Sequence, residues 1–299
     1  MSKSVSRDDI SFNSEGDTVR GWLYRPAGQG PHPVIVMAHG FAAVKEMHLD
    51  SFASAFAGAG FAVLVFDYRR FGASGGLPRQ EIHPESQIED YRNAITYATS
   101  LDSIDAERIG IWGTSYSGGH VLVVAATDPR VACVVSQVPT ISGNAVTKRR
   151  FDRAALSAIV VDQNADRLAR MQGAEPQVKT LVSHDKADRP MYAQREAVEW
   201  YLSSAARGGA FANHVTLRSL EYACAYEPGA YVSFIAPCPL LMIVTTEDVV
   251  TPTDLALEAY ERAQDPKSLH MIEGGHFQPY VAEFASASGA AIDWFKAHL

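Results

Sequence analysis

Residues 108–120 restrict the fold of this chain more than any other stretch of its sequence. A short apolar run, 109–112, meets a dense patch of Gly and Ser residues, and a helical pattern follows. Strand, sharp turn and helix in this order are typical of a nucleophile elbow, where a strained serine needs small residues two positions before and after it. Gly113 and Ser117 occupy these positions around Ser115. The stretch therefore predicts Ser115 in the turn between a strand and a helix.

A second serine offers an alternative interpretation of the same stretch. Ser117 as the nucleophile would give the pattern S-x-S-x-G, with Gly119 in the last position. That choice would move the turn two residues into the helix, so we favour Ser115 and keep Ser117 as the alternative.

Apolar runs of strand length alternate with helical segments along most of the chain. They cover residues 34–38, 61–66, 109–112, 131–136, 240–245 and 268–272. Runs without polar alternation indicate strands buried on both faces, as in a parallel sheet covered by helices. Residues 8–26 add two strands joined across a turn, which predicts an antiparallel pair. Together these patterns predict an α/β fold with a mostly parallel, eight-stranded sheet flanked by helices.

The alternation stops between the sixth and seventh predicted strands. Residues 140–231 are rich in Ala, Arg and Glu and contain no run typical of a strand. Their amphipathic segments lie at 151–161, 166–171 and 191–206. A segment of this length is too long for a plain loop. We expect an inserted helical cap over 140–231 and a core made of residues 1–139 and 232–299.

Polar residues stand at the ends of four predicted strands. His39 follows the third strand, Ser115 the fifth, Asp248 the seventh and His276 the eighth. Because the carboxyl ends of parallel strands meet at one edge of the sheet, we expect these side chains to collect there. Their order along the chain, Ser then Asp then His, is the order found in α/β-hydrolases.

The chain resembles the α/β-hydrolase superfamily of serine hydrolases that carry a helical cap domain. The motifs behind the resemblance are His39-Gly40-Phe41, Asp67-Tyr68-Arg69 with Gly72, Ser74 and Gly75, the elbow Gly113-Thr-Ser-Tyr-Ser-Gly-Gly119, Asp248, and Gly275-His276-Phe277. The superfamily match covers 33–139 and 236–299. Residues 114–119 and 215–221 more narrowly resemble a branch of polyketide and fungal-toxin hydrolases. The resemblance implies an α/β-hydrolase fold and the chemistry of a serine esterase.

The chemistry of acyl transfer suggests a role for each of these residues. A serine hydroxyl is a poor nucleophile until an imidazole takes its proton, and an acid orients that imidazole. We therefore expect a triad of Ser115 as nucleophile, His276 as base and Asp248 as the orienting acid. The backbone N–H groups of Phe41 and Tyr116 would hold the oxyanion.

Other polar residues near these motifs have simpler explanations. Glu247 and Asp254 compete with Asp248 for the role of the acid, but Glu247 suits an exposed position and Asp254 suits the first turn of the following helix. His39 is expected to be a structural hydrogen-bonding residue beside the oxyanion turn. We expect His120 to be a packed, hydrogen-bonded residue on the helix after the elbow.

Aromatic residues of the predicted cap are the candidates for lining a substrate pocket. They are Trp200, Tyr201, Phe211 and Tyr222. Packing of the helices against the core is the commoner role for such residues. If they do line a pocket, the substrate is a small molecule with an apolar acyl or aromatic ring group.

Charge and cysteine content exclude several function classes. The net charge of -8 argues against a nucleic-acid partner, and the one basic run, 148–150, fits a solvated helix face. Three cysteines without close spacing indicate a reducing compartment and no metal site. No apolar segment resembles a signal peptide or reaches the length of a membrane span, so we expect a cytoplasmic protein without a membrane partner. A homodimer is compatible with such a fold.

The function predicted from these features is that of a serine hydrolase. We expect it to cleave a carboxylic ester, thioester or lactone through an acyl-enzyme, without a metal ion or organic cofactor. Hydrolysis of a C–C or amide bond, peptide bonds included, is the alternative, since the same triad serves these reactions. A non-catalytic binding protein on the same fold is the remaining alternative, although such proteins usually lack part of the triad.

Overall fold

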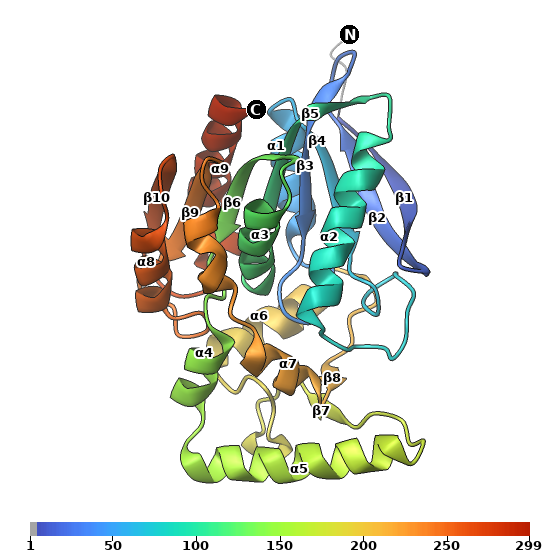
Figure 1. Cartoon of the computed structure of the whole chain (residues 1–299), viewed down its shortest axis with the longest axis vertical. Helices are drawn as coiled ribbons and strands as arrows, with labels where there is room; N and C mark the ends of the chain where they lie inside the picture. The colour runs from blue at the N-terminus through green and yellow to red at the C-terminus, as the bar shows by residue number, and fades with distance from the viewer. Residues whose placement is uncertain (1–4) are drawn as a thin grey trace.

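The computed structural model describes residues 5–299, which form a sheet with helices on both faces and a further group of elements beyond one end of the strands (Figure 1). The strands of the sheet are β1 (Ser6–Ser14), β2 (Asp17–Arg25), β3 (His32–Ala38), β4 (Ala62–Asp67), β5 (Ile104–Thr114), β6 (Val131–Gln137), β9 (Leu240–Thr245) and β10 (Lys267–Ile272). They lie in the order β1-β2-β4-β3-β5-β6-β9-β10. β2 runs antiparallel to β1 and to β4, and the other neighbours are parallel, which confirms the predicted mostly parallel, eight-stranded sheet.

The central strands are buried because their sequences lack polar alternation. Every residue of β4 and of β9 is buried, whereas β1, at the edge of the sheet, is exposed along most of its length. β5 pairs with β3 on one side and with β6 on the other. Ser115, the residue that follows β5, therefore lies near the middle of the sheet's carboxyl edge.

Two layers of helices cover the sheet (Figure 1). One face carries α2 (Pro84–Thr99), α3 (Tyr116–Thr127) and α8 (Thr253–Arg262), and the other carries α1 (Leu49–Gly58) and α9 (Phe284–His298). Their buried faces join two apolar clusters, one on each side of the sheet. In the second cluster, Trp112 of β5 packs against Phe52 and Phe56 of α1, with ring centroids 4.8 and 6.2 Å apart. β5, the strand that leads to Ser115, thus packs against apolar side chains on both faces of the sheet.

A separate short turn precedes the C-terminal helix. The turn is a 3₁₀ helix at Gln278–Tyr280, and α9 begins at Phe284. The backbone of Val281, with φ −130° and ψ −77°, interrupts the two. The separate turn brings the hydroxyl of Tyr280 to within 2.5 Å of Thr114 Oγ1, next to the end of β5.

Residues between β6 and β9 form a group of elements beyond the carboxyl ends of the parallel strands (Figure 1). The group contains α4 (Gly143–Arg150), α5 (Arg153–Met171), α6 (Arg195–Ala205), α7 (Ser219–Ala225) and an antiparallel pair of β7 (Val178–Thr180) with β8 (His214–Thr216). The pair was not predicted, because strands of three residues are too short to show a period. α5 is one helix where the sequence suggested two, since residues 162–165 contain no Gly or Pro. The division into a core and a cap stays a prediction.

Buried hydrogen bonds connect this group to the rest of the chain. Tyr201 of α6 donates to the Phe41 carbonyl oxygen at 2.6 Å, and the hydroxyl of Tyr226, after α7, lies 2.7 Å from His120 Nδ1. α5 contributes little burial of its own, with Asp166 as its buried residue. Among residues 5–299, α5 included, no helix has both the length and the apolar character needed to cross a membrane.

Candidate active site

Ser115 occupies the sharp turn between β5 and α3. Its backbone has φ 58° and ψ −117°, a conformation that residues other than glycine rarely adopt. Gly113 makes the turn possible, because a Cβ atom on it would lie 2.2 Å from the Ser117 carbonyl oxygen. The Ser115 N–H donates to the Gln137 carbonyl oxygen at 2.9 Å, which anchors the turn to β6. The structure therefore has the predicted succession of strand, turn and helix, with Ser115 in the turn.

Ser117, the alternative nucleophile, is buried in a chain of hydroxyl groups. The Tyr91 hydroxyl accepts from the Ala38 N–H at 3.0 Å and donates to the Trp112 carbonyl oxygen at 2.9 Å, so its single proton is already used. Ser117 must then donate to Tyr91, 2.7 Å away, and it accepts from Tyr68 at 3.0 Å. The hydroxyl of Ser117 thus donates one hydrogen bond and accepts another, both with tyrosine side chains.

Two residues from neighbouring strand ends complete a hydrogen-bonded chain with Ser115. His276, in the loop after β10, places Nε2 3.0 Å from Ser115 Oγ. Its Nδ1 lies 2.7 Å from Oδ2 of Asp248, in the loop after β9. An imidazole that donates from Nδ1 to a carboxylate presents the lone pair of Nε2 to the serine. Both His276 and Asp248 are buried, so water does not weaken the chain.

Asp248 is held in place by the loop that follows it. Its Oδ1 accepts from two successive backbone N–H groups of that loop, at 2.8 and 2.7 Å. Glu247 is exposed, and Asp254 forms a surface ion pair with Arg149 at 2.6 Å. Of the three acids considered from the sequence, the structure brings Asp248 to His276.

The loop after β3 lies directly against Ser115. A Cβ atom on Gly40 would come within 3.0 Å of the Ser115 Cβ, which explains the glycine at this position. His39 Nδ1 lies 3.0 Å from the Gly40 carbonyl oxygen, and burial lowers the pKa of His39, so a neutral ring donates this bond. The C=O and N–H of one peptide point in opposite directions. By fixing the Gly40 carbonyl, His39 therefore also fixes the direction of the Phe41 N–H.

Phe41 and Tyr116 border Ser115 from two elements. Tyr116 is the first residue of α3, where backbone N–H groups have no acceptor within the helix. The rings of Phe41 and Tyr116 meet edge to face, with centroids 5.2 Å apart. The hydrogen bond from Tyr201 to the Phe41 carbonyl ties this loop to α6. The two residues named from the sequence as backbone donors thus lie side by side at Ser115.

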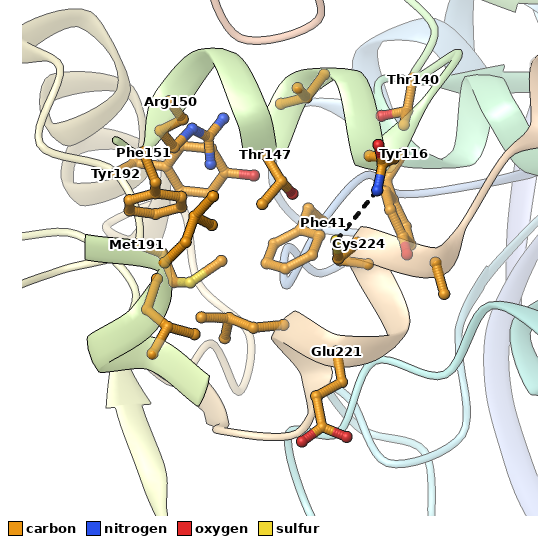
Figure 2. A pocket seen from close by; sticks show the side chains of 18 of the residues that line it. Phe41, Tyr116, Thr140, Thr147, Arg150, Phe151, Met191, Tyr192, Glu221 and Cys224 are labelled. Carbon is orange, nitrogen blue, oxygen red and sulfur yellow. Dashed lines mark hydrogen bonds between the residues drawn. The ribbon is translucent and has the colours of Figure 1, made fainter. Parts of the chain in front are cut away.

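Ser115 lines a cavity of about 530 Å³. Figure 2 shows this cavity from close by, with Phe41 and Tyr116 among its lining residues. Phe41 and Tyr116 line it near the serine, and most of the remaining lining comes from α4, α5, α7 and the loop before α6. Its apolar lining includes Val146, Phe151, Leu156, Ile159, Met191 and Leu220. An apolar group of a ligand would leave water on entering such a space, which favours its binding.

The four aromatic residues proposed from the sequence as lining residues are not part of the lining of this cavity. Trp200 stacks on Phe277, with ring centroids 5.0 Å apart, and lines a small second cavity that Ser115 and His276 also line. Phe211 stacks on Tyr201, and Tyr222 packs edge-on against a histidine ring. Packing between elements accounts for these contacts, and α4 and α5 supply the wall of the cavity instead.

The α5 side of the cavity has a signature in the sequence. Leu156, Ile159, Val160 and Gln163 line the cavity, and their spacing of i, i+3, i+4 and i+7 marks one face of a helix. An apolar helix face that packs on a core and one that borders a cavity need the same residue types. The spacing could therefore have identified these residues as one face of a helix, but it could not have shown that this face borders a cavity.

His120 on α3 is buried behind the site and has a hydrogen-bonding partner on each side. Nε2 lies 3.0 Å from Gln87 Oε1, and Nδ1 lies 2.7 Å from the Tyr226 hydroxyl. Burial lowers the pKa of His120 to about 3. The neutral ring donates to Gln87 and accepts from Tyr226, as a packed histidine does.

Comparison with protein families and curated proteins identifies relatives along nearly the whole chain. The family model described as X-Pro dipeptidyl-peptidase (S15 family) matches residues 15–278. The quorum-quenching protein AidA of Acinetobacter baumannii (strain MDR-ZJ06) is 37% identical, over 96% of this chain and 94% of AidA. The acyltransferase drtE of Aspergillus calidoustus is 31% identical, over 93% of this chain and 90% of drtE. The thiohydrolase aneE of Aspergillus aculeatus (strain ATCC 16872 / CBS 172.66 / WB 5094) is 33% identical, over 87% of this chain and 82% of aneE.

A solved structure matches the same extent of the chain. The crystal structure of the α/β hydrolase GrgF from Penicillium sp. sh18 superimposes with a TM-score of 0.86 at 27% identity. The match covers 98% of this chain and 99% of GrgF. Agreement over almost the entire length confirms the α/β-hydrolase fold that the sequence motifs implied.

Proposed function

Because the chain belongs to the X-Pro dipeptidyl-peptidase (S15) family and is an α/β-hydrolase enzyme, we propose that it cleaves an ester, thioester or lactone of an apolar acyl compound through an acyl-enzyme on Ser115. One observation carries the proposal. The hydrogen-bonded chain from Asp248 through His276 to Ser115 ends at an apolar cavity of about 530 Å³. The chain supplies an activated nucleophile, and the cavity supplies space for the acyl group.

Acylation begins when Ser115 Oγ attacks the carbonyl carbon of the bound substrate. His276 Nε2, 3.0 Å from this oxygen, takes the hydroxyl proton, and Asp248 stabilises the imidazolium that results. The carbonyl oxygen becomes an oxyanion, which the backbone N–H groups of Phe41 and Tyr116 would hold. Each such donor is worth about 3 kcal/mol in the transition state.

The tetrahedral intermediate then collapses and releases the alcohol or thiol. His276 returns its proton to the leaving oxygen or sulfur, and the acyl group stays on Ser115 as an ester. A water molecule, deprotonated by the same imidazole, attacks this ester and releases the carboxylic acid with the serine restored. In a lactone the leaving alcohol belongs to the same molecule and remains attached to the product.

The names of two relatives favour an acyl group as the transferred unit. One relative is named a thiohydrolase and the other an acyltransferase. An acyl-enzyme performs both kinds of chemistry, because either water or a second nucleophile can take the acyl group. Acyl transfer is therefore our second candidate function. Chromatography of the products separates the two, since hydrolysis yields free acid and transfer to an added alcohol or amine yields a new ester or amide.

The peptidase activity in the family's name fits the cavity less well. An exopeptidase that releases dipeptides must bind the charged amino terminus of its substrate, which calls for a free carboxylate. Glu221 lines the cavity, but Arg167 already holds both its oxygens, each at 2.8 Å. Arg150 also lines the cavity, and its positive charge repels an ammonium group. We therefore rank amide hydrolysis below ester cleavage.

Replacement of Ser115 by Ala tests the proposal. We expect kcat/KM for a panel of para-nitrophenyl esters to fall by about three orders of magnitude or more, with an unchanged circular dichroism spectrum. A fluorophosphonate probe should label the wild-type protein and leave the variant unlabelled. Full esterase activity in Ser115→Ala would refute the nucleophile, and an unlabelled wild-type protein would favour a non-catalytic binding protein.

A further inference from the structure

The basic run at residues 148–150 is not the uniformly solvated face that the sequence suggested. Lys148 and Arg149 are exposed, and Arg149 forms a bidentate ion pair with Asp254 of α8, at 2.7 and 2.6 Å. Arg150, the last residue of α4, turns the other way and lines the cavity (Figure 2). The same helix therefore presents cations both to the surface and to the proposed acyl site.

The guanidinium of Arg150 contacts an aromatic ring and, in the part of the chain that the structure describes, no hydrogen-bond acceptor. Its Cζ lies over the Tyr192 ring, 4.6 Å from the ring centre, so the cation rests on an aromatic surface. A guanidinium carries five N–H donors, and a contact with the face of an aromatic ring does not use them as hydrogen bonds to an oxygen acceptor. Within residues 5–299, the ion pairs and side-chain hydrogen bonds of the run 148–150 all belong to Arg149.

A few polar side chains besides Arg150 line this mostly apolar cavity. Thr147 lies one turn earlier on the same side of α4, and Gln163 of α5 also lines the space. Glu221 lines it as well, but Nη2 of Arg167 donates to both oxygens of that carboxylate and neutralises it. Of the charged residues that line the cavity, Arg150 is therefore the one without an ion-pair partner among residues 5–299.

The Arg150 side of the cavity lies away from the reacting serine. Figure 2 shows Arg150 and Tyr192 on one side of the cavity and Tyr116, the neighbour of Ser115, on the other. Between them, the ring of Phe41 meets that of Tyr192, with centroids 5.9 Å apart. An acyl group attached to Ser115 would thus extend along apolar side chains toward a cation.

We propose that Arg150 binds an anionic oxygen group, such as a carboxylate, carried by the acyl portion of the substrate. The inference rests on the proposed acyl-enzyme at Ser115 and specifies its substrate class as acyl chains that end in an acid rather than a methyl group. A planar carboxylate matches the edge of a guanidinium and forms two charge-assisted hydrogen bonds with it. The apolar lining strengthens this pair, because few water molecules compete with it there.

Matched pairs of substrates test the assignment. The para-nitrophenyl half-esters of adipic, suberic and sebacic acid are compared with the para-nitrophenyl esters of hexanoic, octanoic and decanoic acid. The reacting bond is the same within each pair, so the ratio of the two kcat/KM values reports on the terminal group. We expect the wild-type enzyme to prefer the acid at one chain length, where the carboxylate reaches Arg150. Arg150→Met should lower kcat/KM for that half-ester by about 10- to 100-fold and leave the neutral ester near its wild-type value.

Two further variants separate recognition from packing. Arg149→Met removes a cation from the outer side of the same helix and should leave the ratio unchanged, whereas Arg150→Lys should retain part of the preference. Equal losses for both members of a pair in Arg150→Met would overturn the proposal and assign Arg150 to packing on Tyr192. A wild-type preference for the methyl-ended ester at every chain length would overturn it too.

If the protein does not have the proposed esterase function, the substrate pairs give a different result from the one expected for a wrong assignment of Arg150. In that case the wild-type enzyme cleaves neither member of any pair. Calorimetric titration of the free dicarboxylic acids into the wild-type protein and Arg150→Met then still decides the role of Arg150. Tighter binding to the wild-type protein by about tenfold would support a carboxylate site, and equal affinities would exclude one.

Discussion

Two serines stand two residues apart in the elbow, and the partners of their hydroxyl groups differ. Ser115 Oγ lies 3.0 Å from His276 Nε2, whereas Ser117 donates its proton to the phenol of Tyr91. A phenol is no base at neutral pH, so this hydrogen bond does not activate Ser117. The departure of the elbow from the common pattern G-x-S-x-G thus has a structural reason, because the second serine completes the hydrogen bonds of buried tyrosines.

Ser117→Ala should therefore lower stability and preserve activity. The change removes the acceptor of the Tyr68 hydroxyl and the donor to Tyr91. A buried polar group left without a partner costs about 1–3 kcal/mol. We expect the free energy of unfolding, measured by urea titration, to fall by that amount, while kcat/KM stays near the wild-type value. Loss of activity with unchanged stability would instead indicate that Ser117 takes part in the reaction.

At the scale of single residues, the sequence was most informative where a polar residue follows a strand. Ser115, Asp248 and His276 could be selected because the strand ends of a parallel sheet converge, and the structure brings them within hydrogen-bonding distance. Trp200 and Phe211 could not be placed in the same way. An aromatic side chain packs equally well on a neighbouring helix and on a ligand, so its residue type does not distinguish the two.

Among the elements, α5 is notable for how little of it is buried. Its inner face, which includes Leu156 and Ile159, borders the cavity, and Val161 on another face is exposed. Asp166 is its buried residue, in contrast to α2 and α3, which pack on the sheet along their length. If the cavity holds the acyl group as proposed, the inner face of α5 limits the space for that group, and its exposed face does not.

A larger side chain on the inner face of α5 should shorten the acyl groups that the enzyme accepts. Ile159→Trp would fill part of the cavity, and each methylene of the substrate that no longer fits costs about 1–3 kcal/mol of transition-state binding. We expect kcat/KM for para-nitrophenyl decanoate to fall by about tenfold or more relative to that for the acetate. Initial rates over a series of acyl lengths measure the effect.

Val161→Trp is the control on the same helix, because this residue is exposed and is not part of the cavity lining. The variant should leave the dependence of kcat/KM on acyl length unchanged. If both variants shift that dependence, or neither does, α5 does not limit the acyl site.

The elements also show which local patterns are sufficient for prediction. The strands β3, β4 and β9 were predicted to within two residues of their ends, because continuous apolar runs identify buried strands. The arrangement of α4 to α7 could not be predicted. It depends on contacts between residues distant in sequence, such as the hydrogen bond from Tyr201 to Phe41. The pattern of apolar and polar residues within one segment does not indicate such contacts.

At the scale of the whole molecule, one buried imidazole joins three parts of the chain. His120 on α3 hydrogen bonds with Gln87 on α2 and with Tyr226, which follows α7. Tyr226 belongs to the same apolar cluster as the helices on this face of the sheet. Separation of these parts on unfolding exposes the ring to water, so the protonation of His120 affects the stability of the entire protein.

The free energy of unfolding should therefore decrease in acid, with His120 responsible for part of the slope. Burial lowers the pKa of this residue from its usual value of 6.5 to about 3 in the folded protein. Between these values the unfolded chain binds a proton that the folded chain does not, so acid favours unfolding. The contribution of the neutral ring is complete above the unfolded pKa and is lost by up to about 1.4 kcal/mol per pH unit as the pH falls.

Urea titrations at several pH values below 6.5 measure this slope. His120→Gln keeps a donor and an acceptor for Gln87 and Tyr226 but has no titratable ring, so its slope should be shallower by about 1.4 kcal/mol per pH unit. Ser117→Ala, which removes no titratable group, should show the wild-type slope at a lower stability. Equal slopes in the wild type and His120→Gln would mean that the folded protein takes up the proton as readily as the unfolded chain. That outcome would require the Tyr226 hydroxyl to turn and accept from Nδ1, at the expense of its present role as donor.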